Sequence, residues 1–225
     1  MIPILKGEAP RELIEAYNRG DSYDIFRYKD SVKEALLKEQ GYLCAYCMSR
    51  IDMPKESSHI EHWIAQSTNK ELDLDYKNML AVCSGNEGNK KSCSHYNKSK
   101  EEEPLLHCDK RKGNLPLKYN PSCDNSELLG IKYAFDGSVS SSDDEFSEQL
   151  EKVLNLNIEF LKNNRKSTLD GFQEAIKKKY KEKCIKFDKG VVEKEIALAL
   201  ARDKEFKIKP YCGIILYWLN KKLKG

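Results

Sequence analysis

Apolar residues recur every three or four positions in several stretches of the chain, a spacing that predicts amphipathic helices. We expect a capping box of Ser31 with Glu34 to open the second N-terminal helix, and one of Ser142 with Glu145 to open the first C-terminal helix. The pattern therefore predicts a mainly helical frame, with helices over roughly 10–17, 31–40, 143–163, 167–183, 189–204 and 211–222.

Two stretches depart from this helical pattern. Residues 131–139 carry Asp136-Gly137 between apolar-rich flanks, which predicts a β-hairpin. Residues 41–115 are rich in Cys, His, Asn, Ser and Lys and show little periodicity, as in a small module whose core is partly replaced by metal. We therefore predict an α+β protein with an N-terminal helical scaffold (1–40), a metal-braced module (41–126), and a hairpin with a C-terminal helical domain (127–225).

Composition excludes several classes of protein. With 40% hydrophobic and 33% charged residues, the 225-residue chain has the balance of a folded globular protein. Its longest apolar run, 211–219, is less than half of the roughly 20 residues that cross a bilayer. The first nine residues lack the length and order of a signal peptide. We expect a cytoplasmic protein with reduced thiols, whose eight cysteines favour metal ligation over disulfides.

Four of these cysteines form a candidate zinc site. Cys44 and Cys47 are separated by two residues, so a tight turn can aim both sulfur atoms at one tetrahedral ion. A redox dithiol is the alternative, but no thioredoxin-like strand and helix surround this pair. Cys83 follows an apolar run and Cys108 opens a basic segment. We predict that Cys44, Cys47, Cys83 and Cys108 bind one structural Zn²⁺.

Further thiol and imidazole groups leave a second metal site open. Cys93, His95 and His107 lie in or beside the insertion between Cys83 and Cys108, and Cys123 follows. Their spacing is irregular and the insertion is polar, which favours a surface excursion instead. Cys184 and Cys212 occur within helical apolar patterns and are expected to be buried thiols.

A second cluster of polar residues can perform hydrolysis. Glu61 and Asp109 can hold one divalent ion, Mg²⁺ or Mn²⁺, through carboxylate oxygens. His62 can take the proton of an attacking water, and Asn78 can supply an oxygen that fixes the tautomer of its ring. Adjacent strand residues point to opposite faces, so a bend or a strand end must bring Glu61 and His62 to one site. His59 has no assigned catalytic role, and we expect it either to support a metal ligand or to be structural.

With these residues in place, the segment 41–112 resembles the HNH endonuclease family, the ββα-metal nucleases, in the variant braced by a zinc-bound cysteine quartet. The resemblance implies that Glu61 is the first metal ligand, His62 the general base, Asn78 the middle residue of the motif and Asp109 the last metal ligand. Glu61 and Asp109 both depart from the residue types most frequent at these positions.

More narrowly, most of the chain is similar to the HNH subunit of Septu-type anti-phage systems, including retron-linked forms. The support consists of His59-Ile60-Glu61-His62 with an aromatic residue next, 83–88, 108–114, Leu154-Asn155-Leu156-Asn157 and Pro210-Tyr211-Cys212-Gly213. This similarity implies an ABC-type ATPase partner. The apolar residues that could dock it, or could instead pack only within this chain, are Ile214, Ile215, Leu216 and Leu219.

Charge gives weaker support for a nucleic-acid partner. The net charge is only +3, but residues 160–225 carry 18 Lys and Arg against 8 Asp and Glu. Lys110, Arg111 and Lys112 follow Asp109 and could contact phosphate, or could form a solvated helix face. We therefore expect direct hydrolysis of phosphodiester bonds, with DNA favoured as substrate and RNA, for example tRNA, as the alternative. The alternative of another class is a non-enzymatic zinc-ribbon interaction module.

Overall fold

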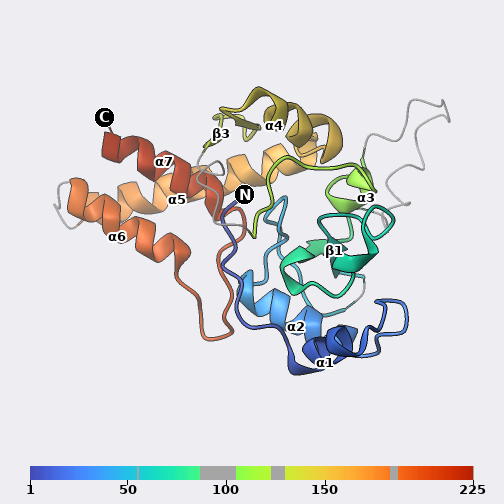
Figure 1. Ribbon diagram of the computed structural model, residues 1–225. Coiled ribbons are helices and arrows are strands. Elements are labelled where there is room, and N and C mark those ends of the chain that lie inside the picture. Colours follow the sequence, from blue (N-terminus) through green and yellow to red (C-terminus); the bar gives the residue numbers. More distant parts are fainter. Residues whose placement is uncertain (55, 87–104, 123–129, 183–186, 225) are drawn as a thin grey trace.

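The computed structural model describes residues 1–54, 56–86, 105–122, 130–182 and 187–224, and there the chain is a mixture of helices and small sheets (Figure 1). One part holds α1 (Arg11–Arg19), α2 (Lys29–Glu39), the hairpin strands β1 (Ser58–His62) and β2 (Met79–Cys83), and the short α3 (Asp109–Lys112). The other holds strands β3 (Ile131–Tyr133) and β4 (Val139–Ser141) with α4 (Asp144–Glu148), α5 (Glu159–Glu182), α6 (Lys189–Leu200) and α7 (Cys212–Lys224).

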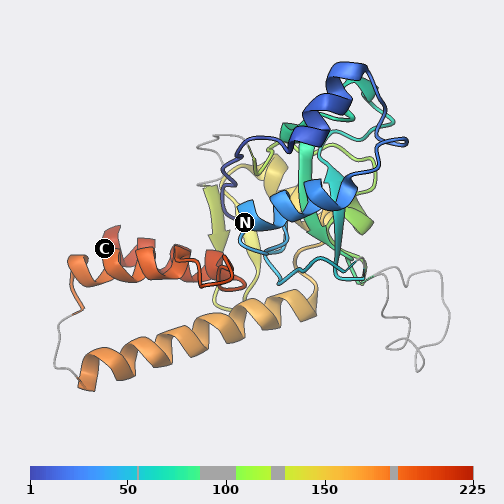
Figure 2. The same ribbon diagram turned by 90° about the horizontal axis from the view of Figure 1, so that it is seen from below.

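Buried apolar side chains from both parts belong to one continuous core. Leu36 of α2, Leu80 of β2, Phe146 of α4 and Ile215 of α7 are all completely buried in it. Figure 2 shows α5 and α7 side by side, extending away from α1 and α2. The three-part division of the chain at residues 40 and 126 stays a prediction of the sequence.

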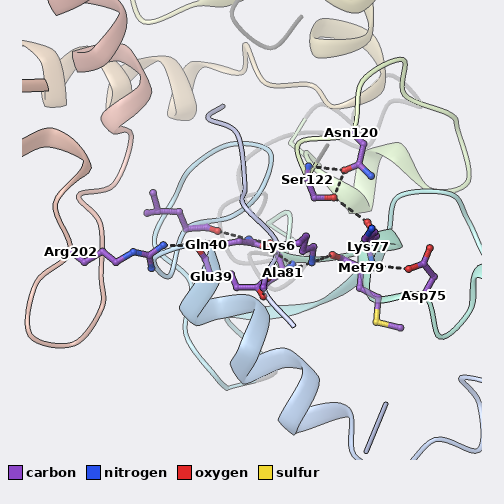
Figure 3. Close-up of polar contacts among 12 residues, drawn as sticks. Lys6, Glu39, Gln40, Asp75, Lys77, Met79, Ala81, Asn120, Ser122 and Arg202 are labelled. Carbon is purple, nitrogen blue, oxygen red and sulfur yellow. Dashed lines mark hydrogen bonds and ion pairs between the residues drawn. The ribbon is translucent and has the colours of Figure 1, made fainter. Parts of the chain in front are cut away.

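Strand β2 is fully buried, and side chains from other segments satisfy its backbone. It pairs antiparallel with β1, Glu61 opposite Leu80 and His62 opposite Met79. On its other side, the Gln40 amide donates to the Ala81 carbonyl (2.7 Å) and accepts from the Ala81 amide (2.8 Å). Lys6 Nζ donates to the Met79 carbonyl at 2.6 Å (Figure 3). These bonds leave few buried backbone groups unpaired and set the strand's position rigidly.

The helical pattern is confirmed for α1, α2, α6 and α7, and the predicted hairpin forms as β3 and β4. The predicted break between the two middle helices is wrong. The chain leaves the helical path at 154–158, after a π-helical turn over Gln149–Val153, and α5 then runs unbroken from Glu159. The residues expected to lie in a loop at 164–166 are therefore helical.

Tertiary bonds explain this early break. Asn155 has a positive φ of 51°, and its side-chain amide donates to the Leu106 carbonyl. The Leu154 carbonyl accepts from the Cys108 amide at 2.9 Å. The Asn157 side chain bonds both the amide and the carbonyl of Val139. These contacts outweigh the local helical preference of the segment.

Neither predicted capping box forms as expected. Helix α2 begins at Lys29, so Ser31 lies inside it, and its N-cap, Tyr28, makes no side-chain cap. The N-cap of α4 is Asp143, whose carboxylate accepts from the Phe146 amide at 2.8 Å. A carboxylate accepts this bond as well as a hydroxyl does, so a run of Ser and Asp does not show which residue is the N-cap of the helix.

In the described part of the chain, no helix is both long and apolar enough to span a bilayer.

Candidate metal and catalytic centre

The four predicted zinc cysteines come together. Cys44 and Cys47 lie in a tight turn in which the Met48 amide donates to the Cys44 carbonyl and the Cys44 amide to the Ser49 carbonyl. Cys83 ends β2, and Cys108 is the N-cap of α3. All four are buried, and their sulfur atoms lie within 4.8 Å of one another. Among the described residues, this is the group of three or more Cys, His, Asp or Glu side chains whose ligand atoms are close enough to share one ion.

The spacing of these sulfur atoms fits zinc. Four thiolates about 2.3 Å from one tetrahedral ion would have S–S edges of about 3.8 Å. The structure gives 3.8 Å between Cys44 Sγ and Cys108 Sγ, and 3.8 Å between Cys47 Sγ and Cys83 Sγ. His107 Nδ1 lies 3.1 Å from Cys108 Sγ, so this buried ring contacts the quartet from outside. The four cysteines could therefore bind a metal ion.

The hairpin and α3 bring the predicted carboxylates together. On β1, His59 and Glu61 are two positions apart and share one face. On α3, Asp109 and Lys112 are three positions apart and also share one face. The two faces meet in two polar pairs, His59 Nε2 with Asp109 Oδ2 at 2.5 Å and Glu61 Oε1 with Lys112 Nζ at 2.7 Å.

The pKa values of Glu61 and Asp109 are shifted in opposite directions. Burial, followed by the hydrogen bond and charge of Asp109, raises the pKa of Glu61 to about 8 despite the opposing effect of Lys112. Burial would raise the pKa of Asp109 as well, but hydrogen bonds from His59 and Glu61 lower it to about 2. Tyr46 donates to Glu61 Oε1 at 3.2 Å. Two carboxyl groups therefore lie beside each other, and carboxylate oxygens are the ligand atoms that hard divalent cations prefer.

His62 stands at the end of β1 and is oriented from two sides. Its Nε2 lies 2.9 Å from the Asp73 carbonyl, and the edge of its ring packs against Tyr23 with centroids 4.6 Å apart. A carbonyl only accepts, so Nε2 carries the proton in this bond and Nδ1 keeps a lone pair. Burial lowers the pKa of His62, which favours the neutral imidazole. The ring is thus held as the tautomer that a general base needs at Nδ1.

Asn78 acts differently from our expectation. Its side chain does not hold the His62 ring. It accepts from the Ile64 amide (2.8 Å) and donates to the carbonyls of Ile64 (3.0 Å) and Leu72 (3.3 Å), which closes the loop between β1 and β2. The loop then presents the neighbouring Asp73 carbonyl to His62. The tautomer is therefore set by a backbone group, with Asn78 acting through the loop.

The basic residues after Asp109 do not share one environment. Arg111 is exposed and Lys110 is half-buried. Lys112, expected among the phosphate-binding residues, has a fully buried side chain next to Glu61, because α3 turns that face toward β1. The predicted phosphate contact of Lys112 is therefore wrong, because its ammonium group contacts Glu61 inside the protein.

Other predicted residues fall in three groups. Cys212 is completely buried, as expected. Cys93, His95, Cys123 and Cys184 lie outside the described residues. Of the four residues expected to dock a partner, Ile214, Ile215 and Leu219 are at most 1% exposed within this chain, which leaves only Leu216 half-buried.

His59 was expected either to support a metal ligand or to be structural, and it contacts Asp109 from the strand face that it shares with Glu61. Sequence reasoning missed two other contributors to this centre. Tyr46 lies inside the Cys44–Cys47 turn and reaches Glu61. Asp73 acts through its backbone carbonyl, which no residue type reveals.

Comparison with known proteins gives a partial similarity to a nuclease. No protein-family model matches the chain. Among curated proteins, it is similar to the Escherichia coli protein named "Retron Ec83 putative HNH endonuclease", with 32% identity over 84 residues. The match covers 32% of this chain and 32% of the relative, so it spans about a third of that protein's length. It supports a relationship to HNH-type nucleases.

Proposed function

We propose that the chain is a metal-dependent HNH endonuclease that hydrolyses phosphodiester bonds, with DNA as the favoured substrate. The observation that carries this proposal is the arrangement at the hairpin: a tautomerically fixed His62 next to a strand residue, Glu61, that meets Asp109 of α3. A β-hairpin followed by a short helix, with Glu61 and Asp109 between them and His62 at the end of β1, is the arrangement expected of a ββα-metal module. The similarity to a retron HNH endonuclease points the same way.

Two ions are part of the proposal. The four cysteines would hold Zn²⁺, which braces the hairpin against the start of α3. Glu61 and Asp109 offer hard oxygen ligands that fit Mg²⁺ or Mn²⁺, with His59 beside them. When bound, such an ion stabilises negative charge on the phosphate and on the leaving oxygen.

The chain's own residues then supply proton transfer and positioning. His62 Nδ1 accepts the proton of the water that attacks phosphorus, while the Asp73 carbonyl stabilises the resulting imidazolium through Nε2. Asn78 keeps the loop closed so that this carbonyl stays in place. Lys112 contacts Glu61 from inside the protein and opposes the rise of its pKa, which favours the carboxylate form. The attack is direct, and the protein forms no covalent intermediate.

The test is cleavage of plasmid DNA and total tRNA by the wild type and by His62→Ala, with Mg²⁺ or Mn²⁺. We expect metal-dependent cleavage that falls by about 100-fold or more in the variant, since general-base catalysis contributes about that much. Unchanged circular dichroism and zinc content in His62→Ala serve as the folding control. Cleavage that survives the substitution would remove His62 as the base, and cleavage of tRNA alone would make RNA the substrate.

The resemblance to Septu-type subunits also leads us to propose a role in anti-phage defence, together with an ABC-type ATPase of the same system. Repeating the cleavage assay with that ATPase and ATP tests this step. A zinc-ribbon interaction module is the competing function. It would show zinc binding without cleavage in either assay, and with no effect of substitutions at His62 or Asp109.

A further inference from the structure

The C-terminal end of α7 carries only positive charge. Lys221, Lys222 and Lys224 are exposed in its last turn, and the chain has no Asp or Glu after Glu205. Cations at the C-terminus of a helix are stabilised by the helix dipole, which alone would account for these lysines. The dipole does not account for the aromatic side chains that lie on the same surface.

Three aromatic rings stand among these lysines. Phe135, in the turn between β3 and β4, is 77% exposed, whereas Tyr217 and Trp218 are half-buried. Lys221 Nζ lies 4.9 Å from the centroid of the Tyr217 ring, and Lys222 Nζ lies 5.5 Å from that of Trp218. We define the α7 face as Phe135, Tyr217, Trp218, Lys221, Lys222 and Lys224.

Two hollows border the α7 face. A groove of about 340 Å³ runs between α7, strand β3 and residues 1–3, and it is lined by Tyr217, Lys221 and Lys224. A second hollow of about 30 Å³, room for about one water molecule, is lined by Phe135 and Trp218, and again by Tyr217 and Lys221. A planar group in the larger groove would therefore contact the Tyr217 ring and the Lys221 ammonium group together.

The neighbouring carboxylates only partly offset this charge. Asp136 and Glu159 share one cation, Lys162, at 3.6 and 3.4 Å. Lys162 therefore neutralises one of these two carboxylate charges, and the other opposes the three positive charges of the α7 face. The balance still favours an anionic partner.

We infer that the α7 face binds single-stranded nucleic acid. Unpaired bases stack on aromatic side chains, and lysines contact the phosphates between them. A duplex keeps its base faces stacked inside and would use the lysines alone. Figures 1 and 2 place this end of α7 on the opposite side of the molecule from α3, so the strand would be held at a distance from the hydrolytic centre. As a substrate contact, this inference rests on the proposed function, but the binding itself does not.

The test measures binding without cleavage. The His62→Ala variant is used to prevent cleavage, because a chelator would also remove the ion bound by the cysteines. Binding of fluorescein-labelled oligo(dT) and oligo(U) to this variant is measured by fluorescence anisotropy. In this background, Lys221→Glu/Lys224→Glu should weaken binding about tenfold or more and lower the salt slope by about 1.4, the value for two phosphate contacts on a single strand. Phe135→Ser should weaken it about fivefold through lost stacking.

The matched control is Lys194→Glu/Lys204→Glu, which makes the same charge change at exposed positions outside the α7 face. Equal loss in this control, or binding within twofold of the parent for Lys221→Glu/Lys224→Glu, would overturn the inference. So would binding to phosphatidylserine vesicles but not to oligonucleotides. A wild-type chain that binds through the α7 face but cleaves nothing would reject the nuclease and keep this inference. Cleavage by the wild type, together with unaltered binding in Lys221→Glu/Lys224→Glu, would keep the nuclease and reject this inference.

Discussion

His59 Nε2 lies 2.5 Å from Asp109 Oδ2, which joins the middle of strand β1 to the first turn of α3. A second contact joins the same two elements, between Glu61, two residues further along the strand, and Lys112, three residues further along the helix. Because Asp109 follows the zinc-site residue Cys108 directly, the position of its carboxylate depends on both the cysteine quartet and His59. The carboxyl groups that we propose as metal ligands are therefore held in place by His59, Lys112 and the cysteine quartet.

We expect His59→Ala to lower cleavage by about 10–100-fold, the usual effect of losing a residue that orients a metal ligand. Zinc content and melting temperature should change little, because the His59 ring is partly exposed. Titration of Mn²⁺ against cleavage rate is the measurement, and the required Mn²⁺ concentration should rise. His59→Gln, which can still donate to Asp109, should recover part of the rate. An unaltered Mn²⁺ requirement in His59→Ala would show that the contact is incidental.

Lys112→Met should destabilise the fold by about 3 kcal/mol, at the low end for a broken buried ion pair. The loss is limited because Glu61, with its pKa already raised to about 8, can become neutral. Urea denaturation measures the change, and the exposed Lys194→Met serves as the control, with an expected change below about 0.5 kcal/mol. Adding Glu61→Gln to Lys112→Met should restore part of the stability. Additive losses in the double variant would argue against a coupled pair.

Cys83→Ser and Cys108→Ser should each reduce bound zinc well below about one ion per chain and lower the melting temperature, since the metal links segments far apart in sequence. Zinc is measured by mass spectrometry of the metal and stability by calorimetry. Cys212→Ser changes an equally buried thiol outside the quartet and should keep the zinc. Full zinc occupancy in both quartet variants would exclude these ligands.

Lys6 gives the fold a measurable pH dependence. Burial lowers its pKa to about 8 from 10.5, despite the opposing charge of Glu39. Between these two values the folded chain binds fewer protons than the unfolded chain, so the free energy of unfolding should rise with pH, by up to about 3 kcal/mol. Denaturation of the wild type and of Lys6→Met across this range isolates the contribution, with the exposed Lys194→Met as the control. Parallel pH curves for the wild type and Lys6→Met would contradict the assignment.

How much the sequence predicted depended on how local the signal was. The cysteine quartet and most helices could be predicted because ligand spacing and apolar periodicity act over a few residues. The pairing of Lys112 with Glu61 could not, because a basic run after Asp109 does not show which side chain faces the hairpin. The early break at Leu154 was equally hidden, since its cause is a bond to Cys108 from a distant segment.

That bond between Leu154 and Cys108 has a consequence for how the protein can be divided. The segment 154–157 supplies hydrogen-bond partners to Cys108, to Leu106 and to Val139, so it connects the zinc-site end of α3 with the second hairpin. Excision or transplantation of the hydrolytic segment alone would cut these bonds at the residue that precedes Asp109. The C-terminal half thus supports the proposed hydrolytic centre structurally, and the two halves can be expected to change together in evolution and to resist exchange between proteins.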